Sequence, residues 1–463
     1  MVHVLLVTFP GQGHINPSLQ FAKRLSKLGV KVTFLTSLSA IRRMTTTSST
    51  VDGLIDFVSF TDGYDNGWST HDAQNFMSAL RNHGSKAVED AIRAKREEGH
   101  PFTRVIYTLL VPWAGQVASH LQIPVSLLWI QPATVFGVYF YYFNKYFDAL
   151  RSTDQVIKLP GLPVFEPSDL PSFLFPSNTN VYDFVLPNFI ENFEILDRED
   201  SPIILVNTFQ ALEPEPLSVI DKYKLMAIGP LIPSAYLDGK DPSDTSFGGD
   251  LIQKSVDYVQ WLDSKEKSSV IYVAFGSYSE ISKPQTEEIA KGLIKSGRPF
   301  LWVIRGVENS GKLEEILSCG KDLEKQGKIV PWCTQVEVLS HPSVGCFFTH
   351  CGWNSSLESL VSGVPVVSFP QWSDQTTNAK LIQDYWRTGV SVRKSEDGGL
   401  VKADEIERCL EIVMDGGERA EEMRRQARKW RDLAKEAAKE GGTSFVNLKT
   451  FADQVLGADT MRN

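Results

Sequence analysis

Residues 332–375 read WCTQVEVLSHPSVGCFFTHCGWNSSLESLVSGVPVVSFPQWSDQ and carry the strongest structural signal in the chain. The apolar run at 344–349 predicts a buried strand. A tight turn is expected at 350–352, followed by a helix that continues to about residue 362. A Gly-Val-Pro break then leads into another strand at 364–369. Where a strand, a glycine turn and a helix N-terminus meet, backbone N–H groups and the helix dipole favour a bound anion.

Polar side chains stand at the start of this predicted helix. Asn354 and Ser355 are residue types that cap helices, and we expect them to cap this one. Together with Glu358 they are spaced i, i+1 and i+4, so the three side chains should face the same end of a pocket. This density of polar and dipolar groups fits a nucleotide sugar.

The first half of the chain shows the alternation of strands and helices that is typical of an α/β fold. The apolar run at 2–9 predicts a strand, Asn16 and Pro17 begin a helix that runs to about Leu28, and 30–36 predicts the second strand. This spacing implies a parallel, doubly wound sheet. Later strands of that sheet are expected at 105–108, 125–129 and 203–207.

A chain of 463 residues exceeds the usual limit for one hydrophobic core, so two domains are expected. Residues 237–250 are rich in Pro, Gly, Asp and Ser and are interpreted as the interdomain linker. The predicted division is an N-terminal domain at 1–240, a C-terminal domain at 251–440 and a last segment at 441–463. In the second half we expect strands at 269–275 and 300–304, and helices at 286–294, 376–385, 403–414, 418–439 and 444–455.

Composition excludes several classes of partner. The formal net charge is −9 and no long basic run occurs, which argues against nucleic acid and anionic membranes as partners. The five cysteines are odd in number and form no Cys-x-x-Cys, and no secretory signal precedes the first strand, so a cytoplasmic protein is expected. The uncharged stretch 125–143 is interrupted at Gln131-Pro132 and is interpreted as a strand and a helix, not a membrane span.

The stretch 332–375 resembles, over its whole length, the plant secondary product glycosyltransferase box of family 1 UDP-glycosyltransferases. The Gly-Gln-Gly-His-Ile-Asn-Pro loop at 11–17 is also similar to this family, whose nearest members glucosylate anthocyanins, hormone acids, crocetin and related acceptors. The resemblance implies the α/β GT-B fold, with two Rossmann-like doubly wound parallel-sheet domains facing a central cleft. It also implies UDP-glucose as the sugar donor and a final helix that packs back on the N-terminal domain.

The resemblance assigns donor-binding roles by position. It implies that Trp332 stacks on the uracil, the backbone at Cys333 meets the uracil edge, and Gln335 and Glu358 contact the ribose. The phosphate contacts implied in the same way are His350, Asn354, Ser355 and Ser277, and the sugar contacts are Trp353, Asp374 and Gln375. A Gln at the end of the box is typical of glucose rather than galactose donors.

Transfer leaves negative charge on the departing UDP, and a group must stabilise it. Many sugar transferases use a divalent metal held by an Asp-x-Asp pair, but the sequence contains no Asp-x-Asp. The helix N-terminus after His350, with Asn354, Ser355 and Ser277, can supply the stabilisation. No metal and no other cofactor are therefore expected.

His14 is the predicted catalytic base. A neutral imidazole beside Gly13 can face the acceptor and remove its proton while the oxygen attacks the anomeric carbon, which inverts that centre. The family places an Asp after a strand as the partner of this His, in a pattern like Asp-x-Phe-x-Pro-Trp. Here residues 107–113 read YTLLVPW, so Thr108 stands where Asp is expected, and no Asp occurs from residue 91 to 147.

A Thr hydroxyl can orient an imidazole but cannot stabilise its charged form. Either another carboxylate reaches His14, or the acceptor needs little help from a base, as an ionised carboxylic acid or an acidic phenol would. The acceptor is expected to be a small apolar metabolite, and its predicted contacts are His14, Gly13, Trp113, Phe136, Tyr139 and Phe140. The aromatic residues Phe136 to Phe147 can equally pack between layers of the fold.

Two other functions compete with glucosyl transfer. A dinucleotide-binding fingerprint at Gly11-x-Gly13 is weak, because its third glycine position holds Asn16 and no acidic residue ends the second strand. A non-catalytic protein that binds a UDP-sugar is the second alternative, and Thr108 is the feature that favours it. We expect a monomer, and the sequence leaves the acceptor open between a phenolic hydroxyl and a carboxylate.

Overall fold

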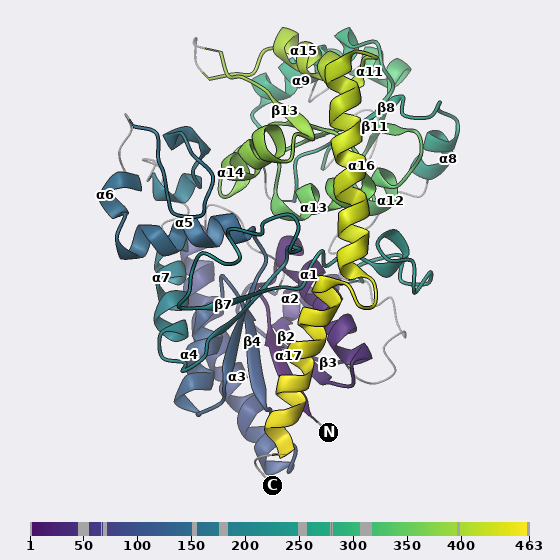
Figure 1. Ribbon diagram of the computed structural model, residues 1–463. Helices are drawn as coiled ribbons and strands as arrows, with labels where there is room; N and C mark the ends of the chain where they lie inside the picture. Colours follow the sequence, from purple (N-terminus) through teal and green to yellow (C-terminus); the bar gives the residue numbers. More distant parts are fainter. Residues whose placement is uncertain are drawn as a thin grey trace. The chain divides into compact units, whose positions relative to one another are not determined.

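The computed structural model describes residues 2–44, 55–65, 67, 72–150, 155–175, 184–248, 257–277, 279, 281–305, 317–395 and 399–460. The chain forms two compact units (Figure 1). The N-terminal unit contains Met1–Leu251 together with Glu436–Asn463, and the C-terminal unit contains Ile252–Lys435. Each unit is built around its own parallel sheet.

The N-terminal unit holds a seven-stranded sheet in the order β3-β2-β1-β4-β5-β6-β7, and all of its neighbouring strands are parallel. The strands are β1 His3–Val7, β2 Lys31–Ser37, β3 Ile55–Phe60, β4 Arg104–Thr108, β5 Val125–Trp129, β6 Ile203–Val206 and β7 Lys224–Ala227. The order reverses between β1 and β4, and ligands of open α/β sheets bind at the carboxyl ends of the strands at such a point.

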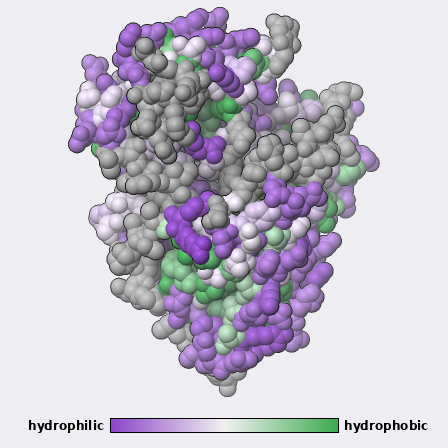
Figure 2. Space-filling model, turned by 180° about the vertical axis from the view of Figure 1, so that it is seen from behind, coloured by the Kyte–Doolittle hydropathy of each residue, from purple (hydrophilic) through white to green (hydrophobic). Residues whose placement is uncertain are grey.

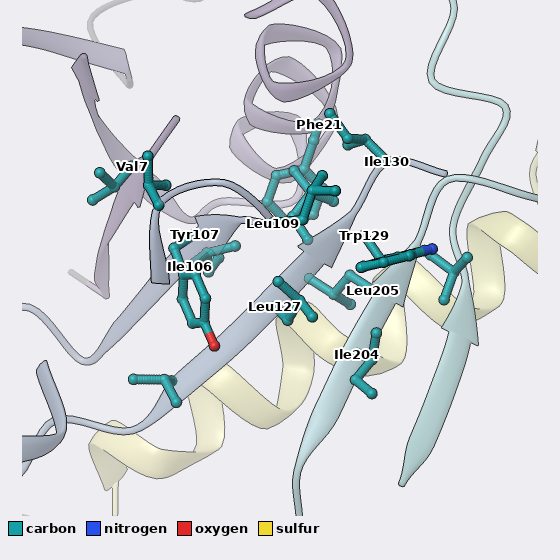
Figure 3. Packing of buried hydrophobic residues seen from close by; sticks show 14 of the residues in the cluster. Val7, Phe21, Ile106, Tyr107, Leu109, Leu127, Trp129, Ile130, Ile204 and Leu205 are labelled. Carbon is teal, nitrogen blue, oxygen red and sulfur yellow. The ribbon is translucent and has the colours of Figure 1, made fainter. Parts of the chain in front are cut away.

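Helices cover both faces of this sheet, as its nearly continuous apolar strands require. They are α1 Gln12–Lys27, α2 Leu38–Arg43, α3 Ala73–Glu97, α4 Pro112–His120, α5 Ala133–Asn144, α6 Phe147–Leu150, α7 Val185–Leu196 and α17 Thr443–Thr460. Figure 3 shows part of the core, where Tyr107, Leu127 and Ile204 lie side by side because they are register partners on β4, β5 and β6.

The C-terminal helix α17 packs within the N-terminal unit. Its Phe451 ring lies 6.4 Å from the Phe21 ring of α1, and Asn447 donates a 2.9 Å hydrogen bond to the carbonyl of Ala227 on β7. Leu448, Phe451 and Val455 belong to the same hydrophobic core as β1 and β4. The last helix therefore closes the unit with which the chain begins.

The C-terminal unit holds a six-stranded parallel sheet in the order β10-β9-β8-β11-β12-β13. Its strands are β8 Val270–Ala274, β9 Phe300–Val303, β10 Lys328–Val330, β11 Val344–Thr349, β12 Val366–Ser368 and β13 Gly389–Ser391. Its helices are α8 Tyr258–Asp263, α9 Lys283–Lys295, α11 Gly320–Gln326, α12 Gln335–Leu339, α13 Trp353–Ser362, α14 Gln375–Lys380, α15 Ala403–Met414 and α16 Glu418–Ala438. Alternate residues of β8 enter two separate hydrophobic clusters, so both faces of the sheet are covered.

The segment predicted as the interdomain linker, 237–250, is largely anchored where the structure describes it, up to residue 248. Leu237 and Phe247 are buried, and Asp244 forms a 2.8 Å ion pair with Lys23 of α1. Arg24, also on α1, donates to the carbonyl oxygens of Pro230 and Ile232 just before this segment. The polar residues that suggested a linker therefore fasten it to α1.

Among the described residues, no helix is long and apolar enough to cross a membrane. The stretch 125–143 instead divides into β5 and α5, as predicted. On the face drawn in Figure 2 most of the coloured surface is hydrophilic, with one hydrophobic patch in its lower part.

Candidate active site

The predicted donor-binding residues gather at the carboxyl edge of the C-terminal sheet. Strands β8 and β11 are neighbours with Ala274 opposite Thr349, so the residues that follow them emerge together. Gly276 and Ser277 come after β8, while the turn at residues 350–352 comes after β11 and leads into α13. This is the edge at which parallel α/β sheets bind their ligands.

His350 is held between two glycines. A Cβ atom at Gly276 would lie 2.5 Å from His350 Nε2, and one at Gly352 would lie 2.6 Å from the same atom. Gly276 also has φ +80°, a conformation that side chains disfavour. Burial lowers the pKa of His350 to about 4, so the imidazole is neutral near pH 7. It can donate a hydrogen bond to an anion but carries no charge.

Helix α13 begins at Trp353, one residue earlier than the predicted cap. The N-cap residue is Gly352, and no side chain caps the helix, so the prediction that Asn354 and Ser355 cap it is wrong. Both residues lie inside the first turn, because Gly352 already provides the extended backbone that an N-cap needs. The N-terminus of an α-helix presents backbone N–H groups and the positive end of the helix dipole, which makes this end suited to an anion.

Gln335 connects two other predicted donor residues, Ser355 and Glu358. Its Nε2 donates to Ser355 Oγ at 2.9 Å and to Glu358 Oε2 at 3.0 Å. Its Oε1 accepts from the hydroxyl of Tyr272 at 3.4 Å, which fixes the orientation of the amide. Glu358 and Ser355 are both buried, so the carboxylate and the hydroxyl are preorganised rather than solvated.

The predicted uracil contacts lie beside this network. Trp332 is half-buried, and Cys333 is buried with its sulfur 3.4 Å from the Tyr272 hydroxyl. Tyr272 stacks on Phe347 with ring centroids 4.9 Å apart. Burial raises the pKa of Tyr272 well above its usual value, so it remains a neutral hydrogen-bond donor. Tyr272 was not predicted as a site residue, because in the sequence it is one more residue of an apolar strand.

Asp374 and Gln375 stand at the start of α14 and are tied to the turn after β11. Asn378 Nδ2 donates to Asp374 Oδ2 at 2.7 Å and to the carbonyl of Cys351 at 2.9 Å. Gln375 Oε1 accepts from the backbone N–H groups of residues 371 and 372, at 2.8 and 3.2 Å. These bonds use the oxygen of the Gln375 amide, so its NH₂ group is the part suited to a sugar hydroxyl. Sequence analysis also did not identify Asn378.

Trp353 and Ser277 are the two remaining predicted donor residues. The side chain of Trp353 is buried against Trp386, with ring centroids 5.9 Å apart, so a contact with the sugar would come from its main chain. Ser277 is half-buried, and its carbonyl accepts a hydrogen bond from the Arg305 guanidinium. Arg305 also donates to the carbonyl of Ser279 at 2.6 Å and thus holds this loop.

In the N-terminal unit, His14 and Thr108 meet at the switch point of the sheet. His14 Nδ1 lies 3.2 Å from Thr108 Oγ1. Thr108 ends β4, and His14 lies in the first turn of α1, the helix that follows the neighbouring strand β1. The half-buried imidazole is 5.1 Å from the Phe9 ring, and burial lowers its pKa to about 3. Among the described residues, the Thr108 hydroxyl is hydrogen-bonded to the His14 ring and no carboxylate is.

Helix α1 starts earlier than predicted. It begins at Gln12 rather than at Asn16 and Pro17, because Gly11 has the extended backbone of an N-cap and its carbonyl accepts from the N–H groups of His14 and Ile15. His14 therefore sits in the first turn of a helix, and Gly13 beside it is exposed.

The predicted aromatic acceptor contacts fall mostly in the core. Trp113 is 2% exposed, and a Cβ at Gly84 of α3 would lie 2.3 Å from its ring. Phe136 packs on Trp129 and Phe193, and Tyr139 packs on Phe189 with ring centroids 4.5 Å apart. With 1% and 0% of their surface exposed, Phe136 and Tyr139 have no face for a ligand in this structure. Phe140 alone of the three α5 residues is half-buried.

The described part of the chain contains no group of three or more His, Cys, Asp or Glu side chains placed to hold a metal ion. All five cysteines are free thiols.

Comparison with known proteins identifies the family. The sequence model described as UDP-glucoronosyl and UDP-glucosyl transferase matches residues 248–432. The chain is 58% identical to phloretin 4'-O-glucosyltransferase of Malus domestica over 97% of both chains. It is 54% identical to the chloroplastic crocetin glucosyltransferase of Gardenia jasminoides, again over 97% of both.

The fold agrees with this relationship. The crystal structure of Os79 from O. sativa in complex with UDP superimposes with a TM-score of 0.86 at 34% identity, covering 98% of this chain and 100% of Os79. The two Rossmann-like parallel-sheet units are thus those of the GT-B class, as predicted, and the glucosyltransferase prediction is favoured over the non-catalytic alternative. The chain belongs to the family of UDP-glucuronosyl and UDP-glucosyl transferases.

Proposed function

We propose that this protein is an inverting transferase that moves glucose from UDP-glucose to a phenolic hydroxyl or a carboxylate of a small apolar acceptor. The acceptor oxygen attacks the anomeric carbon, the bond from that carbon to the diphosphate oxygen breaks, and UDP leaves with the electron pair. A single displacement of this kind turns the α-linked donor into a β-glucoside or a β-glucose ester.

The donor half of the site uses neutral and dipolar groups for the diphosphate. His350, Asn354, Ser355 and Ser277 are its proposed contacts, with the N-terminus of α13 behind them. The single observation that carries this proposal is the neutral imidazole of His350, wedged between Gly276 and Gly352. The two glycines leave space for the ring nitrogen Nε2, which suits a hydrogen bond to a phosphate oxygen.

The remaining donor contacts follow from the chemistry of each group. Trp332 offers a half-buried ring for the uracil, with the Cys333 backbone at its edge. Glu358 and Gln335 present a carboxylate and an amide to the ribose hydroxyls. Asp374 and Gln375 offer a carboxylate and an amide NH₂ to adjacent hydroxyls of glucose, with the Trp353 backbone beside them.

None of the four proposed phosphate contacts is a carboxylate, whereas a divalent metal bridging a diphosphate to a protein needs oxygen ligands such as Asp or Glu. We therefore propose that catalysis does not depend on a metal. Turnover measured as UDP release should be the same in excess EDTA as with added Mg²⁺ or Mn²⁺. Loss of turnover in EDTA, restored by a metal, would refute this part.

On the acceptor side, His14 is the proposed base and Thr108 its orienting partner. The relatives at 58% and 54% identity carry names that refer to phloretin, a phenol, and crocetin, a carboxylic acid, which supports both acceptor classes for this chain. His14, Gly13 and the half-buried Phe140 remain the proposed acceptor contacts, with Trp113 behind them. The free thiols support a reducing compartment such as the cytosol as the place of action.

The deciding experiment is a panel of acceptors with UDP-glucose and mass detection of the product. Phloretin, trans-cinnamic acid, an aliphatic alcohol and an amine cover the four classes of nucleophile. We expect glucosides or glucose esters from the first two. No turnover with any acceptor while UDP still binds would favour a non-catalytic UDP-sugar binder. UDP release that does not depend on an acceptor would show hydrolysis of the donor instead of transfer.

A further inference from the structure

The hydroxyl of Thr108 has a hydrogen-bonding environment that leaves it two arrangements. Within the described part of the chain its Oγ1 has three neighbours: the N–H of Phe9 at 3.3 Å, Thr8 Oγ1 at 3.5 Å and His14 Nδ1 at 3.2 Å. A hydroxyl has one hydrogen to donate and two lone pairs to accept with. The Phe9 N–H can only donate, so it takes one lone pair permanently.

One hydrogen and one lone pair of Thr108 then remain for Thr8 and His14. Thr108 must donate to one of these neighbours and accept from the other. In the first state Thr8 donates to Thr108 and Thr108 donates to His14 Nδ1, so the ring proton of a neutral His14 sits on Nε2. In the second state His14 Nδ1–H donates to Thr108 and Thr108 donates to Thr8, so His14 Nε2 carries a lone pair.

We propose that Thr108 is a two-state positioning residue that lets His14 take either tautomer, so that one site serves both phenolic and carboxylate acceptors. This inference rests on the proposed function, in which His14 meets the acceptor. An Asp at this position would accept from Nδ1–H and hold the second state alone. A Thr does not impose that choice.

Each state suits a different acceptor. In the second state the Nε2 lone pair takes the proton of a phenol while the phenolic oxygen bonds to the anomeric carbon and UDP leaves with the electron pair. In the first state Nε2–H donates a hydrogen bond to one oxygen of an ionised carboxylate. The other oxygen attacks, UDP leaves in the same way, and no proton moves at His14.

One further hydroxyl, that of Ser18, affects the balance between the two states. Ser18 Oγ donates to Thr8 Oγ1 at 3.2 Å, and both side chains are buried, as is Thr108. In the first state every hydroxyl hydrogen of the chain Ser18, Thr8, Thr108 has an acceptor. In the second state the Thr8 hydrogen has none among the described residues. The first state, with the proton on Nε2, is therefore the resting one, and the long 3.5 Å contact keeps the difference small.

The test uses two variants that should move the acceptor preference in opposite directions. Thr8→Val removes the only acceptor that the Thr108 hydrogen has in the second state, so kcat/KM for phloretin should fall about 3- to 10-fold relative to that for trans-cinnamic acid. Ser18→Ala removes a donor to Thr8 and leaves Thr8 Oγ1 a better acceptor for Thr108. The same ratio should then rise, by about 2- to 3-fold.

Thr33→Val is the matched control. Thr33 is a buried threonine of the same sheet whose hydroxyl bonds to His3 Nε2 at 2.8 Å and takes no part in the chain at His14. It should lower stability without changing the ratio of the two kcat/KM values. A general loss of packing in Thr8→Val or Ser18→Ala would likewise lower both values together and leave their ratio unchanged.

A spectroscopic readout does not depend on the variants. In full-length protein labelled with ¹⁵N-histidine, the free enzyme should show His14 with its proton on Nε2, identified by loss of the signal in His14→Ala. A His14 protonated on Nδ1 in the free enzyme would overturn the proposal, as would a ratio that moves in the same direction in both variants or stays within the control's range. If the wild-type protein glucosylates neither acceptor, the proposed function fails and not the switch alone.

Discussion

Gly352→Ala tests the phosphate site most cleanly. The backbone at Gly352 has φ −57° and ψ 146°, which any residue adopts, so the substitution adds no backbone strain. Its new Cβ would lie 2.6 Å from His350 Nε2, and ordinary contact begins near 3.4 Å. The imidazole must therefore move by about 0.8 Å. A Cβ at Gly276 would lie 2.5 Å from the same nitrogen, so both glycines leave room for this end of the ring.

A displacement of that size breaks a hydrogen bond to a phosphate oxygen. Such bonds span about 2.7–3.2 Å, and one stretched by about 0.8 Å no longer counts as a bond. A hydrogen bond to a charged group contributes about 1.5–3 kcal/mol, so the Kd for UDP and the KM for UDP-glucose should rise roughly 10- to 100-fold. The affinity for the acceptor should not change.

Gly417→Ala is the control. Gly417 directly precedes α16 as Gly352 precedes α13, and its carbonyl accepts from the N–H of Glu421 just as Gly352 accepts from Ser356. A Cβ at Gly417 meets no atom within 4 Å. Calorimetric titration with UDP and steady-state kinetics should separate the two variants. If Gly352→Ala binds UDP as tightly as Gly417→Ala, then His350 does not contact the phosphates and the assigned role is wrong.

Three further predictions concern the base, the pH dependence and the fold. His14→Ala should reduce kcat for a phenol about 10²- to 10⁴-fold, while calorimetry shows unchanged UDP binding. If the affinity for UDP fell as much as kcat, His14 would belong to the donor site. Burial lowers the pKa of His14 to about 3 and those of His3 and His350 to about 4, from 6.5. Below pH 6.5 the unfolded chain binds more protons than the folded one, so these three histidines should lower the melting temperature as the pH falls from 6.5 towards 4. Above pH 7 they should have no effect on it. A melting temperature that rises as the pH falls from 6.5 to 4 would contradict their burial as neutral rings. Glu213→Gln should lower the free energy of unfolding, measured in urea, by about 1–3 kcal/mol, because Glu213 accepts from the N–H groups of Ala133 and Thr134 at the start of α5. An unchanged urea midpoint would show that these hydrogen bonds contribute little to stability.

Long apolar strands were predicted closely because their signal is local. The bounds of β11 and β5 agree with the predicted ranges 344–349 and 125–129, and those of α15 agree with 403–414. Edge strand β3 was not predicted, since Phe57 and Val58 are exposed and the strand lacks a continuous buried run. Helix α3 was also missed, although its buried residues 76, 77, 80, 84, 88 and 92 recur at helical spacing, so the signal was present.

The donor side of the site was more predictable than the acceptor side. Its residues come mostly from one continuous stretch, so a sequence motif can place them together. Tyr272 and Asn378 reach the site through tertiary packing from β8 and α14, and no local pattern marks them. The sequence does not distinguish aromatic residues that line a pocket from those that pack in a core. Phe136 and Tyr139 are assigned to the core by their contacts with Phe193 and Phe189 in the structure.

Calorimetric titration of the full chain with UDP-glucose, with and without EDTA, tests the central claim most directly. Dipolar groups of the C-terminal unit should bind one donor per chain with the same Kd in both conditions, and Glu358→Ala should weaken binding at least about 10-fold through loss of the ribose hydrogen bonds. Absence of binding by the wild-type protein, or binding that disappears in EDTA, would contradict a donor site whose diphosphate contacts are neutral and dipolar groups.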